Sequence, residues 1–219
     1  MSLTIEWFEA GLTTAEYFTR LKTNKEAIPK VYETVQIPAA AKAFFDNPPQ
    51  PLRLAVFTED WCGDALTSTP SILKLADTCA GITARVWERD KNLDLTNSFL
   101  PSHRHGTLPV FVVLDADMRE IARFIETAEE LKPAVGQMMD ALKARLLNPD
   151  ERDKPMPELS PESRAAFGSA RAAYRVAHAP DWGQVVIGAF LACVQQGLVL
   201  PAATRPAVGG TQWPAPHAH

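Results

Sequence analysis

The sequence contains few cysteines and no excess of positive charge. Only 3 of its 219 residues are cysteine, which is too few for a framework of disulfides in a chain of this length. The formal net charge is -4, and lysine and arginine are scattered without a long basic run. We therefore expect neither a disulfide scaffold nor a nucleic-acid-binding surface.

Signals for export or membrane insertion are also missing. Residues 1–7 contain neither a basic segment nor a long apolar one, so no secretory signal is expected. The most apolar stretch, residues 185–200, is interrupted by Gln195 and Gln196. It is shorter than the roughly 20 apolar residues that a membrane span needs. These features predict a cytoplasmic protein without a membrane partner.

Nor does the sequence contain a recognisable cofactor or hydrolase motif. No glycine-rich phosphate loop and no Ser-His-Asp arrangement stands out, and we expect no bound cofactor. The composition, with 46% hydrophobic and 22% charged residues, is typical of a globular protein. A chain of this size fits one ordinary domain with extensions, or two small domains.

Residues 51–148 alternate between apolar strand-like runs and helical patterns. Four strands are expected at 52–58, 82–88, 110–114 and 120–125, because these runs are apolar and bounded by turn residues. Helices are expected at 63–79, 92–100 and 127–147, the last with Thr127 and Glu130 as a capping box. The predicted order is βαβαββα, an α/β domain.

Cys62 lies between the first predicted strand and the helix that follows it. A cysteine at this position faces the unpaired N–H groups and the positive end of the helix dipole, which favours thiolate over thiol. Glu59, Asp60 and Asp64 lie close in sequence and work against thiolate formation. The sequence leaves open whether the dipole or the carboxylates dominate.

The residues around Cys62 carry a resemblance to a known family. Trp61-Cys62-Gly63-Asp64-Ala65 lies where thioredoxins have Trp-Cys-Gly-Pro-Cys, and Pro70 matches the proline of their active-site helix. Residues 107–110, Thr-Leu-Pro-Val, match the cis-proline loop. The chain thus resembles the thioredoxin superfamily. Within it, the chain is most similar to a bacterial group with the single-cysteine Trp-Cys-Gly-Asp-Ala motif.

The resemblance implies a thioredoxin-like fold, a central mixed sheet flanked by helices, and a role for each matching residue. Cys62 would be the catalytic thiol. Trp61 would form the lip beside its sulfur, and Leu108 would offer its backbone to an incoming peptide. Gly63, Asp64 and Pro109 complete the expected substrate-binding set, and a cis Pro109 facing Cys62 would discourage metal capture. No metal site is therefore expected.

Two departures from the family pattern change the expected chemistry. The second cysteine of the motif, which resolves the mixed disulfide in dithiol enzymes, is replaced by Ala65. Dithiol thioredoxins also keep a buried aspartate six residues before the first cysteine, where this chain has Val56. If the domain is redox-active, it is a monothiol.

Three other groups of residues are weaker candidates. His103, Arg104 and His105 could supply positive charge near Cys62, although a solvated loop is the favoured interpretation. Cys79 should lie at the far end of the Cys62 helix, beyond disulfide reach. Cys193 is the one internal candidate for a resolving thiol, but an isolated cysteine in an apolar helix usually belongs to the core.

Extensions flank the thioredoxin-like part. Residues 1–50 are expected to form a helical cover, with Thr13 and Glu16 as a capping box. Residues 149–160 are charged and proline-rich and read as a linker. Two helices are expected in 161–200, the second from about 183 to 198, and a loose tail in 201–219. The two helices should dock on the main domain or on a second subunit, which would make the protein a homo-oligomer.

Two functions from different classes fit these features. In the first, Cys62 forms a mixed disulfide with a protein or low-molecular-weight thiol, and an external thiol releases it. That would make the chain a thiol-disulfide oxidoreductase without a resolving cysteine. In the second, the groove between the Cys62 and Pro109 loops binds an extended peptide or a protein without chemistry. The sequence leaves open whether the protein is an enzyme.

Overall fold

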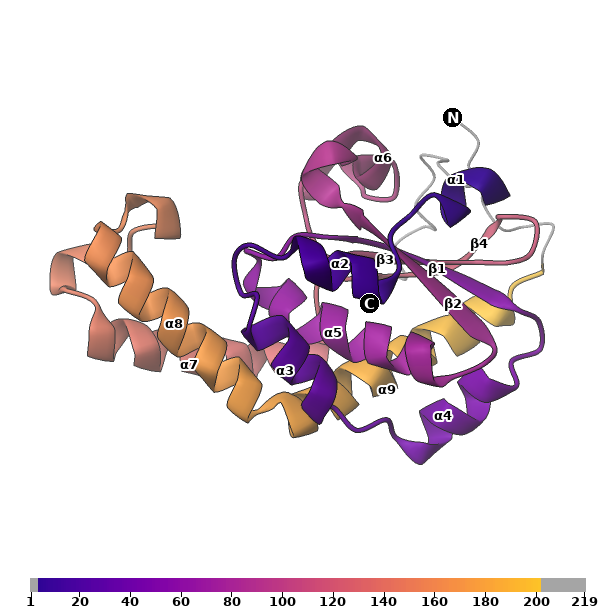
Figure 1. The fold of residues 1–219 in the computed structure, drawn as a ribbon. Coiled ribbons are helices and arrows are strands. Elements are labelled where there is room, and N and C mark those ends of the chain that lie inside the picture. Colours follow the sequence, from indigo (N-terminus) through magenta and orange to yellow (C-terminus); the bar gives the residue numbers. More distant parts are fainter. Residues whose placement is uncertain (1–3, 202–219) are drawn as a thin grey trace.

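A four-stranded mixed sheet forms the centre of the protein in a computed structural model that describes residues 4–201 (Figure 1). The strand order is β2-β1-β3-β4, with β2 parallel to β1 and the other neighbours antiparallel. The strands are β1 (Leu52–Thr58), β2 (Ile82–Glu88), β3 (Val110–Leu114) and β4 (Glu120–Ile125). All four predicted strands are confirmed. Each is an apolar run, and such runs form strands that are buried between two layers of helices.

The two faces of the sheet are covered by different helices. Leu54 and Val56 of β1 point into the larger core, which contains residues of α5 (Gly63–Thr78) and α9 (Ala179–Leu198). Ala55 and Phe57 point to the opposite face, where the side chains come mainly from the regions of α1 (Ile5–Glu9) and α6 (Leu93–Ser98). This alternation follows from the two-residue period of a strand. The result is the predicted thioredoxin-like fold.

The N-terminal region is helical, as predicted. It forms α1, α2 (Thr14–Arg20), α3 (Ala27–Thr34) and α4 (Ala39–Asp46). The predicted capping box is confirmed, since the Thr13 hydroxyl accepts a hydrogen bond from the Glu16 N–H and the Glu16 carboxylate accepts one from the Thr13 N–H. The helix α3 packs along α5 and also contacts α8 (Pro161–Ala177).

The helix that follows β4 does not start as predicted. Thr127 does not cap it, because the Thr127 hydroxyl is buried without a hydrogen-bond partner. The chain instead makes a 3-10 turn, η3 (Glu129–Leu131), before α7 (Lys132–Leu146) begins. The prediction that Thr127 and Glu130 form a capping box at the start of a helix over 127–147 is therefore wrong. Acidic residues in the 3-10 turn precede the helix, but they make no side-chain cap to it.

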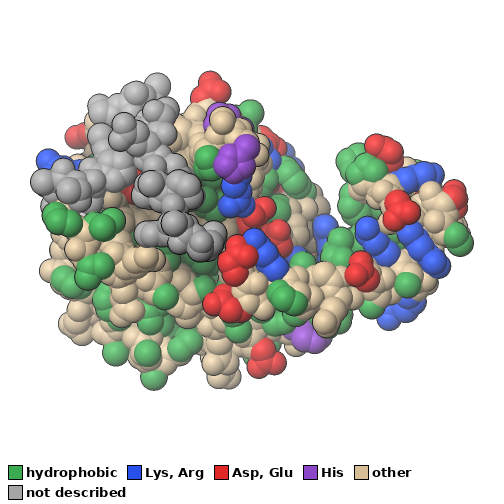
Figure 2. Space-filling model, turned by 180° about the vertical axis from the view of Figure 1, so that it is seen from behind, with side chains coloured by type: hydrophobic (Ala, Val, Ile, Leu, Met, Phe, Trp, Pro, Cys, Tyr) green, Lys and Arg blue, Asp and Glu red, His purple; other side chains and the backbone are tan. Residues whose placement is uncertain are grey.

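The helix packed along β4 is α9. Whereas α7 pairs with α8, α9 lies against β4 and α5. Figure 1 shows α7 and α8 projecting to one side as an arm, and Figure 2 shows from behind that this arm stands apart from the body. The difference follows from composition: α7 buries Met138 and Leu142, whereas α9 buries a long apolar face that includes Val186, Ile187 and Phe190.

The C-terminal region forms the two helices α8 and α9. Ser160 caps α8 through a hydrogen bond from the Ser163 N–H, and α9 starts at Ala179, earlier than the predicted 183. Short 3-10 turns also occur at η1 (Arg89–Lys91), η2 (Ser102–Arg104), η4 (Pro149–Glu151) and η5 (Met156–Glu158). Within residues 4–201, no helix is long and apolar enough to cross a membrane. The tail predicted to be loose lies almost wholly outside the described residues.

Gly197 allows the close approach of α9 to β4. A methyl group added at Gly197 would lie 2.0 Å from the Ile121 carbonyl oxygen, whereas one added at Gly188 meets nothing within 4 Å. We predict that Gly197→Ala lowers the free energy of unfolding by about 1–3 kcal/mol through overpacking. The matched variant Gly188→Ala should raise it by up to about 1 kcal/mol through helix propensity. Urea denaturation of both variants measures this, and equal effects would contradict the packing of α9 on β4.

Candidate functional site

Cys62 occupies the N-cap position of α5, directly after the loop that leaves β1. Its thiol is partly exposed and donates a long, weak hydrogen bond to the Leu108 carbonyl oxygen, with 3.8 Å between sulfur and oxygen. The peptide bond between Leu108 and Pro109 is cis. The structure therefore brings together the Cys62 loop and the Pro109 loop, which are 46 residues apart in the sequence.

The neighbours of Cys62 differ in exposure. The Trp61 side chain is 46% exposed. The Arg89 guanidinium lies over its ring, with 5.7 Å between the guanidinium carbon and the ring centroid. Ala65 and Val56, the two positions at which the chain departs from dithiol thioredoxins, are fully buried. At position 65, where a second thiol would lie, there is only a packed methyl group.

Asp60 and Glu59 are engaged away from the thiol. The Asp60 carboxylate accepts hydrogen bonds from the N–H groups of Lys22 and Thr23, and the Asn24 amide donates to the Asp60 carbonyl oxygen. Glu59 accepts a hydrogen bond from the Asp90 N–H at 2.7 Å. The bonds of Asp60 fix the segment between α2 and α3 against the Cys62 loop, and the bond of Glu59 ties the loop to the turn at Arg89–Lys91.

Two arginines of α8 lie beside Cys62, and the sequence analysis did not foresee them. Arg175 is only 3% exposed and donates to Asp64 at 3.1 Å and to Thr67 at 2.7 Å. Arg171 lies next to Gly63, where an added methyl group would be 3.3 Å from its Nη1 atom. Two arginines four residues apart share one face of a helix, but nothing in the sequence indicated that this face meets α5.

Burial raises the pKa of the Cys62 thiol above its ordinary value, and the Asp64 carboxylate raises it further. Hydrogen bonds from the N–H groups of Ala65 and Asp64, and the charge of Arg175, act in the opposite direction. The helix N-terminus thus does favour the thiolate, as expected, but removal from water outweighs it. Of the three nearby carboxylates, Asp64 has the largest effect on the pKa of the thiol.

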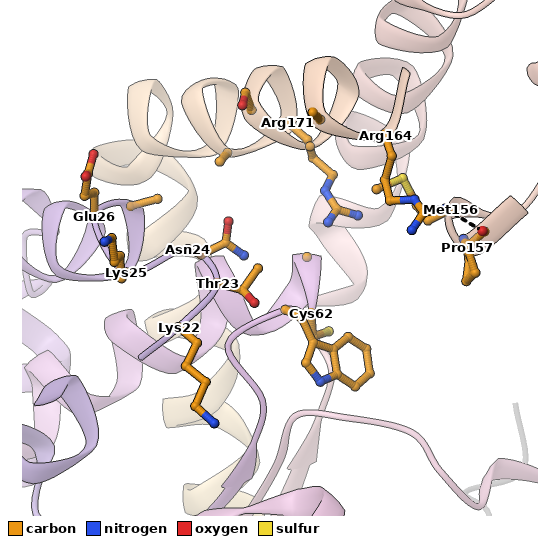
Figure 3. Close-up of a pocket in the computed structure, with 17 residues that line it drawn as sticks. Lys22, Thr23, Asn24, Lys25, Glu26, Cys62, Met156, Pro157, Arg164 and Arg171 are labelled. Carbon is orange, nitrogen blue, oxygen red and sulfur yellow. Dashed lines mark hydrogen bonds between the residues drawn. The ribbon is translucent and has the colours of Figure 1, made fainter. Parts of the chain in front are cut away.

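A cleft of about 920 Å³ opens beside Cys62 (Figure 3). One wall is the segment from Lys22 to Ala27, and the opposite wall is α8 together with Met156 and Pro157. Trp61, Cys62 and Gly63 line the cleft between them. Figure 3 shows Arg171 reaching from α8 toward the Cys62 loop.

The weaker candidates lie elsewhere. Arg104 forms an ion pair with Glu126, and neither His103 nor His105 lines the cleft. Cys79 is the C-cap of α5, as predicted. The Cys193 thiol donates to the Arg123 carbonyl oxygen on β4, and burial raises its pKa to about 11. Among residues 4–201, no group of three or more histidine, cysteine or acidic residues is arranged to hold a metal ion.

The fold and this site together define a thioredoxin-like protein: a mixed sheet, a cysteine at the start of a helix, and a cis-proline loop facing it. A family described as thioredoxin matches residues 11–143, more than half of the chain. The chain belongs to this family. The match includes α2, α3 and α4 but ends within α7, so Arg171 and Arg175 lie outside it.

Two solved structures are similar to the chain. A protein of unknown function from Pseudomonas aeruginosa is 20% identical with a TM-score of 0.55, and the alignment covers 81% of this chain and 99% of that one. An HIV epitope scaffold is 16% identical with a TM-score of 0.52, covering 87% of this chain and 96% of that one. At these identities the likeness supports the fold alone. No curated protein matches the chain.

The balance of charges around Cys62 yields a prediction for Asp64→Asn. Removing this carboxylate also leaves the charge of Arg175 unopposed, and both changes favour the thiolate. The pKa of Cys62 should fall, and alkylation of Cys62 at pH 7 should become severalfold faster, as followed by peptide mass spectrometry. Glu59→Gln serves as the control, because Glu59 faces the Asp90 N–H, and it should leave the rate unchanged. An unchanged rate in Asp64→Asn would contradict this balance.

Proposed function

We propose that the protein is a monothiol redox protein of the bacterial cytoplasm that forms a mixed disulfide through Cys62. The observation that carries this proposal is the position of the Cys62 sulfur. It lies at the N-cap of α5, against the Leu108 carbonyl of the cis-proline loop, and it lines an open cleft. The buried methyl group of Ala65 stands where a second thiol would resolve the intermediate.

The proposed reaction is a thiol–disulfide exchange. The Cys62 thiol loses its proton to solvent, and the thiolate attacks one sulfur of a substrate disulfide. A new bond forms between Cys62 and that sulfur while the substrate S–S bond breaks. The other half leaves as a thiolate and takes up a proton. An external thiol, as its thiolate, then attacks the substrate sulfur of the mixed disulfide and forms a new disulfide with it, while Cys62 leaves as a thiolate and takes up a proton. The two steps together require no other oxidant or reductant.

The surrounding residues supply the substrate-binding surface in this proposal. Trp61 is exposed beside the sulfur, and the Leu108 carbonyl oxygen accepts the hydrogen bond of the Cys62 thiol. Gly63 adds no side chain to the cleft, and Asp64 tunes the thiol through its charge. The substrates would be protein or low-molecular-weight disulfides, and the external thiol would be a small cellular thiol.

One observation favours a second function, that of a binding module without chemistry. Burial raises the pKa of the Cys62 thiol, so little of it is ionised at neutral pH. In that case the exposed Trp61 ring and the loop of Pro109 would hold an extended peptide or a protein partner. The two proposals differ in whether Cys62 is required.

Incubation with glutathione disulfide tests the redox function directly. We predict that Cys62, and neither Cys79 nor Cys193, gains one glutathione as measured by intact-protein and peptide mass spectrometry. The rate should rise with pH beyond the ordinary thiol pKa of about 8.5, because burial raises the pKa of Cys62. Excess thiol should reverse the modification. If Cys62 stays unmodified in the folded protein while Cys62→Ser retains a partner, the binding module is the better description.

Replacing Ala65 supplies the missing thiol. We predict that Ala65→Cys gains dithiol reductase activity, seen as faster reduction of insulin by dithiothreitol. The new thiol would lie on the same turn of α5 as Cys62 and could release the mixed disulfide internally. Ala65→Ser is the matched control, because it has a similar size and no redox chemistry. Equal rates in the two variants would show that this position cannot resolve the intermediate.

A further inference from the structure

We infer that the cleft between α8 and the Cys62 loop selects a small thiol or disulfide that carries an acid group, and that Arg171 binds this group. The inference rests on the proposed redox function of Cys62 and adds the class of substrate. It is carried by residues of α8, which lie beyond the matched family region.

The charge of the cleft is opposite to that of the whole chain. The chain has a formal net charge of -4. The residues lining the cleft, in contrast, include Lys22, Lys25, Arg164 and Arg171, and Glu26 is the one carboxylate among them. A concave surface of one sign concentrates small ligands of the other sign.

Arg171 differs from the neighbouring Arg175 in what it contacts. Arg175 has its carboxylate in Asp64, whereas within residues 4–201 the Arg171 guanidinium forms no ion pair. Arg164, on the same side of α8, donates to the carbonyl oxygens of Pro157 and Leu159. The Asp64 carboxylate attracts the Arg171 guanidinium from a distance but is hydrogen-bonded to Arg175. The Arg171 guanidinium is therefore left to bind a ligand carboxylate or phosphate, the groups that pair best with it.

Arg171 lies close enough to Cys62 that a ligand bound to the guanidinium would also lie beside the sulfur. Its guanidinium lies against Gly63, the residue that follows Cys62, and both residues line the same cleft. An acid group bound to Arg171 would therefore hold the rest of a small ligand beside the thiol. The volume of about 920 Å³ is within the range of pockets that take small molecules.

The wall of α8 leaves room for such a ligand. On the side facing the cleft it carries small residues, Ala165, Gly168, Ser169 and Ala172. A methyl group added at Gly168 would meet nothing within 4 Å. Position 168 therefore has open space in which an introduced side chain can occupy part of the cleft.

Three methanethiosulfonate reagents that differ in charge test the inference at Cys62. They are the neutral methyl reagent, the anionic sulfonatoethyl reagent and the cationic trimethylammonium-ethyl reagent. We expect the anionic reagent to modify Cys62 roughly tenfold faster than the cationic one at low salt, after correction for their intrinsic rates, with the difference shrinking as salt screens the charges. The neutral reagent corrects for any change in the ionisation of Cys62 itself.

Arg171→Met should remove most of this charge preference, measured as the ratio of the anionic-reagent rate to the neutral-reagent rate. The ratio cancels any change that loss of the Arg171 charge makes in the ionisation of Cys62. The matched control is Arg145→Met, which removes an equal charge from an exposed position of α7 that does not line the cleft. It should keep the full preference.

Larger disulfides identify the acid group and test the cleft as its site. Glutathione disulfide offers carboxylates, coenzyme A disulfide offers phosphates, and cystamine is a cationic control. The acid group that Arg171 binds is the one whose disulfide loses most rate in Arg171→Met. Gly168→Leu should slow this disulfide severalfold but not the neutral methyl reagent, and Gly168→Ala should have little effect.

The outcomes distinguish the redox function of Cys62 from the binding of an acid group by Arg171. If the neutral reagent fails to modify Cys62, the redox proposal and this inference both fail. If Cys62 reacts but shows no preference for the anionic reagent, or if Arg171→Met keeps the preference, the redox proposal stands and the inference is overturned.

Discussion

The ion pair between Arg175 and Asp64 is the contact on which the site depends. It joins α8 to the first turn of α5, and a second hydrogen bond from Arg175 to Thr67 strengthens the junction. With α8 held in this place, the Cys62 loop has a wall, and the cleft has a second side. A buried guanidinium needs a carboxylate partner, so the position of one helix is tied to the charge of one residue beside the thiol.

The same contact acts on the ionisation of the thiol. Asp64 raises the pKa of Cys62 and Arg175 lowers it, so the two charges of the ion pair oppose each other at the sulfur. Burial, which raises this pKa, has a larger effect than the N–H groups at the start of α5, which lower it. A cysteine in this state is mostly protonated at neutral pH and becomes more nucleophilic as the pH rises.

The sequence was sufficient to predict the strands and the position of Cys62, because these depend on local apolar runs and on one strand–helix junction. It was not sufficient to predict α8 beside α5. The partners Asp64 and Arg175 are 111 residues apart, and neither has a pattern that points to the other. The capping box at Thr127 failed for the opposite reason: the local pattern was present, but the chain used a 3-10 turn there.

The arm formed by α7 and α8 is an insertion between two elements that pack on each other. Because α9 returns to lie along β4 after the arm, the arm is inserted between a strand and a helix that packs on it. Both of its ends are consequently tied to the same sheet. The connection from 148 to 160 is itself held in place, because the buried Glu151 carboxylate accepts hydrogen bonds from the Ser160 N–H and the Ser163 hydroxyl. Met156 and Pro157 of this connection line the cleft. The wall of the cleft is therefore an insertion with its own internal contacts, attached at both ends to the sheet that supports it.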